Sequence, residues 1–261
     1  MRSGGAGMAL LEVRGLTRSF YGVQALTGLD LQVQAGTITA LIGPNGAGKT
    51  TAFGCISGVV PPDGGRVLLD GSDITGWRPD RVTRAGLTRT FQVARGIPRL
   101  TVIENLLLYA PGLPGERLLP ALLGGGRRQA RAALEQAVAI AARLNLLRVA
   151  DTPAGALSGG QKKLLEIGRA LMARPRLILL DEPIAGVNPS LAEEIAAHLR
   201  TLRDEGMTFL VIEHHMDLIA RLCDPVIVMA EGRRLTEGSF TAIAADPRVQ
   251  EAYMGVRKAV A

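Results

Sequence analysis

The chain has 261 residues, 47% of them hydrophobic and 21% charged, with a formal net charge of +6. These values are typical of a globular protein with a sizeable core and exclude a disordered chain, and aromatic residues at only 3% require that core to be aliphatic. No apolar run reaches the roughly 20 residues that a membrane-spanning helix needs. A basic chain can serve nucleic acid, an anionic membrane or a nucleotide, but no base-stacking aromatics alternate with its basic residues, so nucleic acid is not expected as a partner.

The N-terminal part of the chain predicts a small β-rich layer. Residues 1–8 lack an apolar signal core and are expected to form a flexible leader. Residues 9–42 then alternate short β-type runs, at 10–13 and 29–33, with turns. The run at 37–42, Thr-Ile-Thr-Ala-Leu-Ile, is β-branched and apolar and predicts a buried strand.

A glycine-rich loop follows this strand directly and fits the phosphate-binding pattern G-x-x-x-x-G-K-[ST] at every fixed position. Its glycines allow several backbone N–H groups to point at one anion, Lys49 can reach the β- and γ-phosphates of a nucleotide, and Thr50 offers a hydroxyl to Mg²⁺. Residues 51–56 predict the start of a helix whose N-terminal dipole faces the phosphates. The residues expected to bind the nucleotide here are Gly43, Pro44, Asn45, Gly46, Ala47, Gly48, Lys49, Thr50 and Thr51.

The middle of the chain predicts a change to helix. A turn cluster at residues 61–65 precedes a strand-like run at 66–70, and between 102 and 150 glycines and prolines interrupt the pattern as loops. Residues 130–147 are rich in Ala and Leu, which predicts a helical insertion. Its apolar positions at helical spacing are Leu134, Val138, Ala141 and Leu144.

Two later apolar runs, at residues 177–180 and 208–212, predict parallel strands buried on both faces. The first is followed by Asp181 and Glu182, and the second ends close to His214. Because open α/β sheets bind ligands at the carboxyl ends of their strands, we expect these side chains to act there. A carboxylate at such an end can hold Mg²⁺ through water, and its neighbour can orient an attacking water.

A second glycine motif, Leu157-Ser158-Gly159-Gly160-Gln161, opens a helix-like run at residues 162–173. Ser158 is well placed as the N-cap of that helix, and the two glycines permit close approach of an anion to its start. Such a turn alone indicates little, and its position among the other motifs gives it meaning.

In this order, the motifs resemble those of the nucleotide-binding subunits of ABC transporters, over residues 9–255. The resemblance implies an α/β fold of the ABC-type P-loop NTPases, with a RecA-like, mostly parallel core, an N-terminal antiparallel β layer and a helical subdomain. It implies a single ABC ATPase domain, in which 9–91 and 158–255 form the β layer and core and 92–157 the helical subdomain. Residues 256–261 are then a tail.

The resemblance also implies roles for individual residues. Tyr21, just before Gly22, would stack on adenine, and Gln92 would sense Mg²⁺ and the nucleotide. The residues that it assigns to catalysis are Lys49, Gln92, Glu182 and His214, and those that it assigns to Mg²⁺ are Thr50, Gln92 and Asp181. The signature residues that would contact ATP held by an opposite subunit are Leu157, Ser158, Gly159, Gly160 and Gln161.

The segment after Glu182 points to a subfamily. Ala-Gly-Val-Asn-Pro at 185–189 departs from the Ser-Ala-Leu-Asp common in ABC ATPases, and Asn188 keeps the hydrogen bonding of the aspartate without its charge. With the segments at 89–92 and 101–105, this variant resembles the ATPases of branched-chain and hydrophobic amino-acid uptake systems, most closely the longer of their two paired ATPase subunits.

The resemblance implies ATP and Mg²⁺ as cofactors and a peripheral place on the cytoplasmic side of the cell membrane, in keeping with only two, widely spaced cysteines. The implied partners are transmembrane permease subunits, a second ATPase subunit in a homodimer or heterodimer, and indirectly a substrate-binding protein. The alternatives are an ATPase of lipopolysaccharide export or of urea or amide uptake and, more remotely, a soluble ABC ATPase of translation or repair, or a regulator without turnover. A single phosphate loop without a long heptad run or Cys-x-x-Cys disfavours the soluble classes.

Overall fold

The computed structural model describes residues 9–90, 97–111 and 127–258, with only the backbone for 255–258. The chain divides into two compact units. The first comprises residues 1–89, 176–182 and 199–261, and the second 90–175 and 183–198. The second unit extends beyond the segment 92–157, and the assignment of that segment as a helical subdomain stays a prediction.

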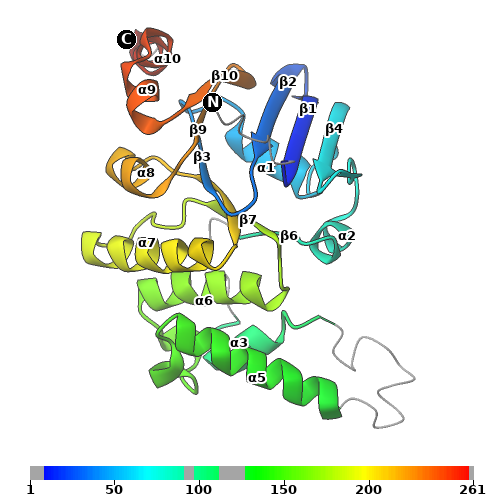
Figure 1. Cartoon of the computed structure of the whole chain (residues 1–261), viewed down its shortest axis with the longest axis vertical. Coiled ribbons are helices and arrows are strands. Elements are labelled where there is room, and N and C mark those ends of the chain that lie inside the picture. The colour runs from blue at the N-terminus through cyan, green and yellow to red at the C-terminus, as the bar shows by residue number, and fades with distance from the viewer. Residues whose placement is uncertain (1–8, 91–96, 112–126, 259–261) are drawn as a thin grey trace, which may run out of the picture. The chain divides into compact units, whose positions relative to one another are not determined.

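The first unit contains an antiparallel sheet of four strands in the order β2-β1-β4-β5 (Figure 1). The strands are β1 (Leu11–Phe20), β2 (Val23–Val33), β4 (Gly64–Leu69) and β5 (Ser72–Asp73). The predicted β-rich layer is therefore confirmed, but β1 and β2 are longer than the runs at 10–13 and 29–33. Both strands continue past a glycine at positive φ, Gly15 in β1 and Gly28 in β2, near irregular pairing of the two strands.

A second sheet of the same unit has six strands in the order β10-β9-β3-β8-β7-β6. All its neighbouring strands run parallel except β10, which is antiparallel to β9. Every residue of β3, β7 and β8 is buried, which explains their continuous apolar runs and confirms the predicted strands. The strands are β3 (Ile38–Ile42), β6 (Leu87–Arg89), β7 (Leu177–Asp181), β8 (Thr208–Ile212), β9 (Val226–Ala230) and β10 (Arg233–Gly238).

One aliphatic core joins both sheets through helix α1 (Lys49–Ile56). Phe53 and Ile56 of α1 are buried in the same cluster as Leu11 of the first sheet and Leu179 of the second. Packing on both sides therefore fixes α1, which is the helix that begins at the end of the phosphate loop. The other helices of this unit are α2 (Pro79–Arg84), α8 (Met216–Leu222), α9 (Phe240–Ala245) and α10 (Pro247–Lys258).

The second unit is helical. Its elements are α3 (Val102–Leu107), α5 (Arg127–Arg143), α6 (Gly159–Met172), the 3₁₀ turns η2 (Leu147–Val149) and η3 (Ala154–Ala156), and the first part of α7 (Pro189–Asp204), whose last residues belong to the first unit. Helix α5 confirms the predicted helix, but not all of its apolar face: Leu134 and Val138 are exposed. Ala141 and Leu144 are buried as predicted. In place of the two exposed residues the buried stripe contains Ala133 and Ala137, because small alanines allow α3 and α6 to approach closely.

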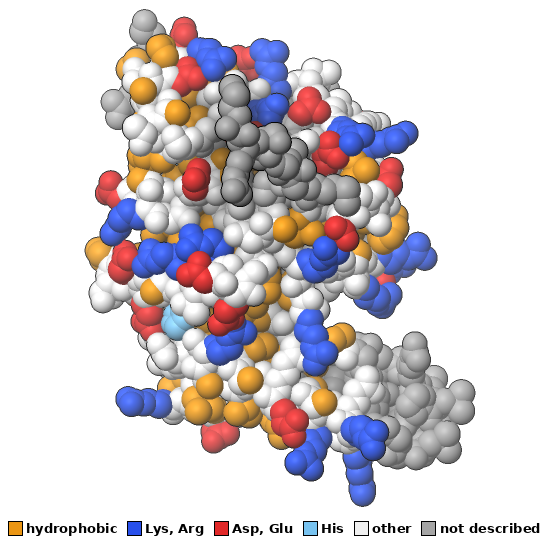
Figure 2. Space-filling view, viewed as in Figure 1, with side chains coloured by type: hydrophobic (Ala, Val, Ile, Leu, Met, Phe, Trp, Pro, Cys, Tyr) orange, Lys and Arg blue, Asp and Glu red, His pale blue; other side chains and the backbone are white. Residues whose placement is uncertain are grey.

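Charge is distributed over the surface. On the face shown in Figure 2, Lys and Arg side chains alternate with Asp and Glu. Several arginines of the described residues lie in exposed ion pairs, such as Arg131 with Glu135 and Arg234 with Glu237. No helix among the described residues is both long and apolar enough to cross a membrane.

Candidate nucleotide site

The phosphate loop runs from the end of β3 into α1, and its path depends on glycine. Gly43 has φ 152°, and a Cβ there would lie 2.2 Å from the carbonyl oxygen of Met229. Gly48 has φ 95°, and its Cβ would lie 2.4 Å from the carbonyl oxygen of Ala25. Backbone in neighbouring strands therefore excludes any side chain at both ends of the loop.

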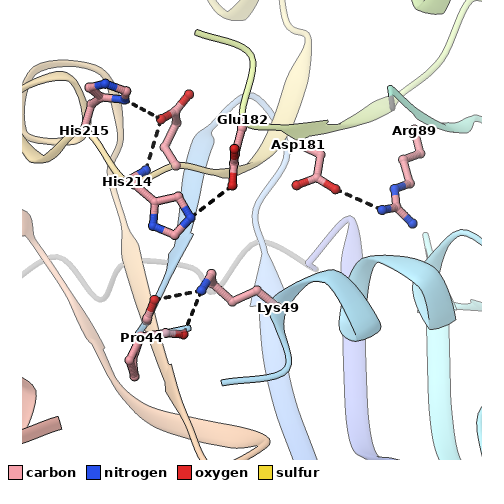
Figure 3. Close-up of polar contacts among 9 residues, drawn as sticks. Pro44, Lys49, Arg89, Asp181, Glu182, His214 and His215 are labelled. Atoms are coloured by element: carbon pink, nitrogen blue, oxygen red, sulfur yellow. Dashed lines mark hydrogen bonds and ion pairs between the residues drawn. The ribbon is translucent and has the colours of Figure 1, made fainter. Parts of the chain in front are cut away.

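Lys49 is buried at the start of α1 and turns back onto its own loop (Figure 3). Its Nζ donates to the carbonyl oxygens of Gly43, at 2.7 Å, and Pro44, at 3.0 Å. Burial lowers the pKa of the Lys49 ammonium, and the charges of Glu182 and Asp181 act in the opposite direction. A phosphate would supply the full counter-charge that two carbonyl groups lack, so this ammonium group is suited to bind an anion. Thr50 follows it in the first turn of α1, and its side chain is exposed.

Parallel pairing of β7 with β8 brings the acidic residues and the histidine together. Asp181 ends β7 opposite Ile212, and the next residue, Glu182, donates its N–H to the carbonyl of Ile212 at 2.9 Å. Beyond the end of β8, the His214 ring reaches back so that Nε2 lies 3.1 Å from Oε1 of Glu182. Figure 3 shows Glu182, His214, Asp181 and Lys49 facing one region at the strand ends. The expected gathering of these predicted residues is confirmed, and their roles stay proposals.

Two further charged residues support this group, and the sequence motifs predict no role for either. Arg89, the last residue of β6, donates from Nη2 to Oδ2 of Asp181 at 2.9 Å. Glu213 is buried and accepts the His214 N–H at 3.0 Å, and its Oε2 lies 3.2 Å from Nδ1 of His215. Glu213 carried a signal, because it is a charged residue directly after the buried strand β8, whereas the partner of Arg89 emerges only from the pairing of β6 with β7.

Tyr21 lies in the turn between β1 and β2, fully exposed and with φ 49°. Residues beside the turn hold it in place. The Asp63 carboxylate accepts hydrogen bonds from the Ser19 N–H at 2.6 Å and from Nη1 of Arg18 at 2.8 Å. The Arg18 guanidinium in turn covers the Phe20 ring at 4.7 Å. Tyr21 is thus an aromatic surface on a fixed turn, available to a planar base.

The signature residues lie in the second unit. Ser158 caps α6 as predicted: its Oγ accepts the Gln161 N–H at 3.3 Å, and the Gln161 side chain accepts the Ser158 N–H at 2.9 Å. Leu157 is buried, whereas a Cβ on Gly159 would meet no atom within 4 Å, so the helix start is open at that point. Gln92 lies outside the described residues.

Asn188 has a local structural task. Its Oδ1 accepts the Leu191 N–H at 2.9 Å, one residue before α7 begins at Pro189. Asparagine performs this capping bond without a charge. The hydrogen bonding expected of Asn188 is confirmed within its own chain.

The residues present fit a magnesium nucleotide. Mg²⁺ is usually held by one or two side chains together with phosphate oxygens and waters, and not by a cage of protein ligands. Thr50 follows Lys49 at the start of α1, and Asp181 is a carboxylate at the buried end of β7. Such a set matches a metal that arrives with its phosphates.

Comparison with known proteins finds relatives over nearly the whole chain. The family profile described as "ABC transporter" matches residues 26–185. The chain is 39% identical to the probable branched-chain amino acid transport ATP-binding protein LivG of Archaeoglobus fulgidus, over 96% of this chain and 97% of the relative. It is 40% identical to the high-affinity branched-chain amino acid transport ATP-binding protein BraF of Pseudomonas aeruginosa, over 94% and 98%.

Solved structures show the same relationship. A nucleotide-free ATP-binding cassette from an ABC transporter has a TM-score of 0.82 and 38% identity, over 94% of this chain and 98% of that one. An ATP-binding cassette in its ADP conformation has the same TM-score and 36% identity, over 95% and 99%. The chain therefore belongs to the ABC transporter family, as an ATP-binding subunit with the ABC-type P-loop NTPase fold.

Proposed function

We propose that this chain hydrolyses MgATP to power the uptake of branched-chain or other hydrophobic amino acids. The observation that carries the hydrolytic part is the grouping of Asp181, Glu182 and His214 at adjacent strand ends, facing Lys49. The substrate part is supported by similarity over nearly the whole chain to proteins named for branched-chain amino acid transport.

Each residue of the group has a task that its geometry favours. Lys49 offsets phosphate charge, and Glu182, held by Ile212 and His214, is placed to orient a water and accept its proton. His214 is proposed to contact the γ-phosphate, and Tyr21 to stack on adenine. Bound Mg²⁺, held by Thr50, Asp181 and Gln92, would supply further positive charge against the phosphates.

We propose further that ATP joins two subunits head to tail. The signature residues Ser158, Gly159 and Gly160 belong to the second unit, and the phosphate loop belongs to the first. In the proposed dimer, the open start of α6 in one subunit meets the γ-phosphate held by the other, where its N–H groups and dipole favour an anion. Hydrolysis then removes the group that both subunits bind, which shifts the population back to monomers.

Glu182→Gln tests the hydrolytic assignment. The amide keeps the size of the side chain but cannot accept a proton, so this variant should bind MgATP, dimerise on a sizing column and release phosphate at least about 100-fold more slowly. Glu251→Gln, an exposed change in α10, is the control with wild-type turnover. Brisk hydrolysis by Glu182→Gln would contradict the proposal.

The transport assignment needs partners. We propose that the chain lies on the cytoplasmic side of the membrane and that two transmembrane permeases dock at its subdomain of residues 92–157. A second ATPase subunit and, indirectly, a binding protein complete the system. Purification of the tagged chain from its host's membranes should recover two multi-spanning permeases and a shorter ATPase. Recovery of a lipid-export bridge, or of ribosomes without membrane proteins, would overturn amino-acid uptake and leave the ATPase chemistry intact.

A further inference from the structure

Arg89 and Asp181 form a buried ion pair inside the first unit (Figure 3). Their side chains are only 11% and 3% exposed, and Nη2 lies 2.9 Å from Oδ2. Each is the last residue of its strand, Arg89 of β6 and Asp181 of β7, and these two strands pair in parallel. A carboxylate buried to this degree is costly without a nearby cation, so the arginine offsets the cost of burying Asp181.

The guanidinium of Arg89 is also held from the side of α1. It lies 5.8 Å from the centre of the Phe53 ring, and a Cβ on Gly54 would be 3.9 Å from Nη1. Phe53 is completely buried, so the ring beside the guanidinium is itself held by the core. The charge of Arg89 is therefore fixed between the helix that begins with Lys49 and the strand that ends in Asp181.

We infer that Arg89 is the resident counter-ion of Asp181 and that nucleotide-bound Mg²⁺ takes over part of this task. In the absence of metal, the arginine holds the carboxylate in place at the end of β7 and supplies the opposite charge beside it. When the metal arrives, two cations share one carboxylate, and their repulsion limits how much Mg²⁺ adds to nucleotide affinity. Arg89 is thus a positioning residue that sets the metal dependence of nucleotide binding. This inference rests on the proposed function, because it requires that Asp181 serve Mg²⁺.

The test is the affinity of the full chain for ADP, measured by calorimetry in Mg²⁺ and in EDTA. The ratio of the two affinities isolates the contribution of the metal. In Arg89→Met and Arg89→Gln, Mg²⁺ relieves a buried carboxylate that has lost its cation, so the ratio should rise about tenfold over wild type. Arg89→Lys keeps the charge and should stay within about twofold of wild type.

Two controls separate this role from general damage. Arg176→Met removes the exposed partner of Asp70 in the same unit and should leave the ratio unchanged. Asp181→Asn combined with Arg89→Met should abolish the rise, because the effect acts through that carboxylate. Melting temperatures provide a second measurement of the same effect. Mg²⁺·ADP should raise the melting temperature of Arg89→Met by more than it raises that of wild type.

The outcomes are distinguishable. If both neutral variants fold and show the wild-type ratio or a lower one, Arg89 is only structural and the inference is overturned. If Arg89→Met does not fold, Arg89→Gln decides, since its amide can still hydrogen-bond to Asp181. If wild-type ADP affinity does not respond to Mg²⁺ at all, the magnesium part of the proposed function fails instead.

Discussion

His214 is held at both its backbone and its ring. The Glu213 carboxylate accepts the backbone N–H of His214, and Nε2 of the His214 ring lies 3.1 Å from Oε1 of Glu182. His214→Ala should reduce turnover about 100-fold, the lower range for the loss of one group that stabilises transition-state charge, while MgATP affinity changes less than threefold. Phosphate release and nucleotide titration measure the two quantities.

The neighbouring histidine is the matched control for this prediction. The His215 side chain is 61% exposed, and its Nδ1 lies 3.2 Å from Oε2 of Glu213. His215→Ala should keep most of the wild-type turnover. Equal losses in the two variants would mean that the segment is merely sensitive to change, and that His214 has no specific part in hydrolysis.

The two cysteines give a prediction about pH. Burial raises the pKa of the Cys55 thiol to about 11 and that of Cys223 to about 12, from an ordinary value of 9.0. Because both folded-state values are raised, the stability contributed by the protonated thiols is complete below about pH 9 and is lost as pH rises toward 11–12. Urea midpoints should therefore fall less steeply between pH 8 and 10 when both cysteines are replaced by alanine. If the urea midpoints of wild type and the double variant fall equally with pH, the pKa values of the two thiols are not raised by folding.

The parts of the site that the sequence predicts are those for which residue type alone limits the possibilities. Only glycine fits at positions 43 and 48, and an acidic pair directly after an apolar run must lie at a strand end. Arg89 could not be assigned in this way, because its partner Asp181 is 92 positions away and only the pairing of β6 with β7 brings them together.

At the scale of elements, the start of α6 offers a matched pair of glycines. A Cβ on Gly160 would lie 2.0 Å from Cδ2 of Leu191, so Gly160→Ala should lower the free energy of unfolding by about 1–3 kcal/mol through overpacking. A Cβ on Gly159 meets nothing, and Gly159→Ala should fold normally.

Dimerisation should be the property that Gly159→Ala changes, although this variant is expected to fold normally. If α6 meets the nucleotide of a second subunit, Gly159→Ala places a methyl group at the open helix start and should weaken ATP-dependent dimerisation in the Glu182→Gln background. Urea unfolding and sizing chromatography measure the two effects. A Gly159→Ala protein that dimerises like its parent would argue against a contact at this residue.

Elements were predictable where burial is two-sided. Strands β3, β7 and β8 are apolar at nearly every position, so no choice of face was required. Helix α5 required such a choice. The predicted face is right at Ala141 and Leu144 and wrong at Leu134 and Val138, because the close packing near those two uses alanine. In β1 and β2, the glycines inside the strands resemble turn residues in sequence. The predicted runs at 10–13 and 29–33 are therefore shorter than the strands.

At the scale of the whole molecule, the two units should respond to different nucleotides. The phosphate loop, Asp181 and His214 all belong to the first unit, so ADP should protect backbone amides there against hydrogen exchange. MgATP with Glu182→Gln should add protection at residues 159–161, in the second unit, once a dimer forms. Protection of 159–161 by ADP in the monomer would be inconsistent with the head-to-tail proposal.

The backbone conformation of Glu182 also affects the stability of the fold. Its φ of 50° lies in the left-handed region, which costs a residue other than glycine about 1–2 kcal/mol. Glu182→Gly should therefore unfold at higher urea than wild type while losing turnover, and an equal or lower midpoint would count against this view. It follows that conformational stability and activity oppose each other at this position. In a lineage released from the need to transport, drift toward glycine here would be expected early, and the loss of this glutamate would mark the inactive descendants.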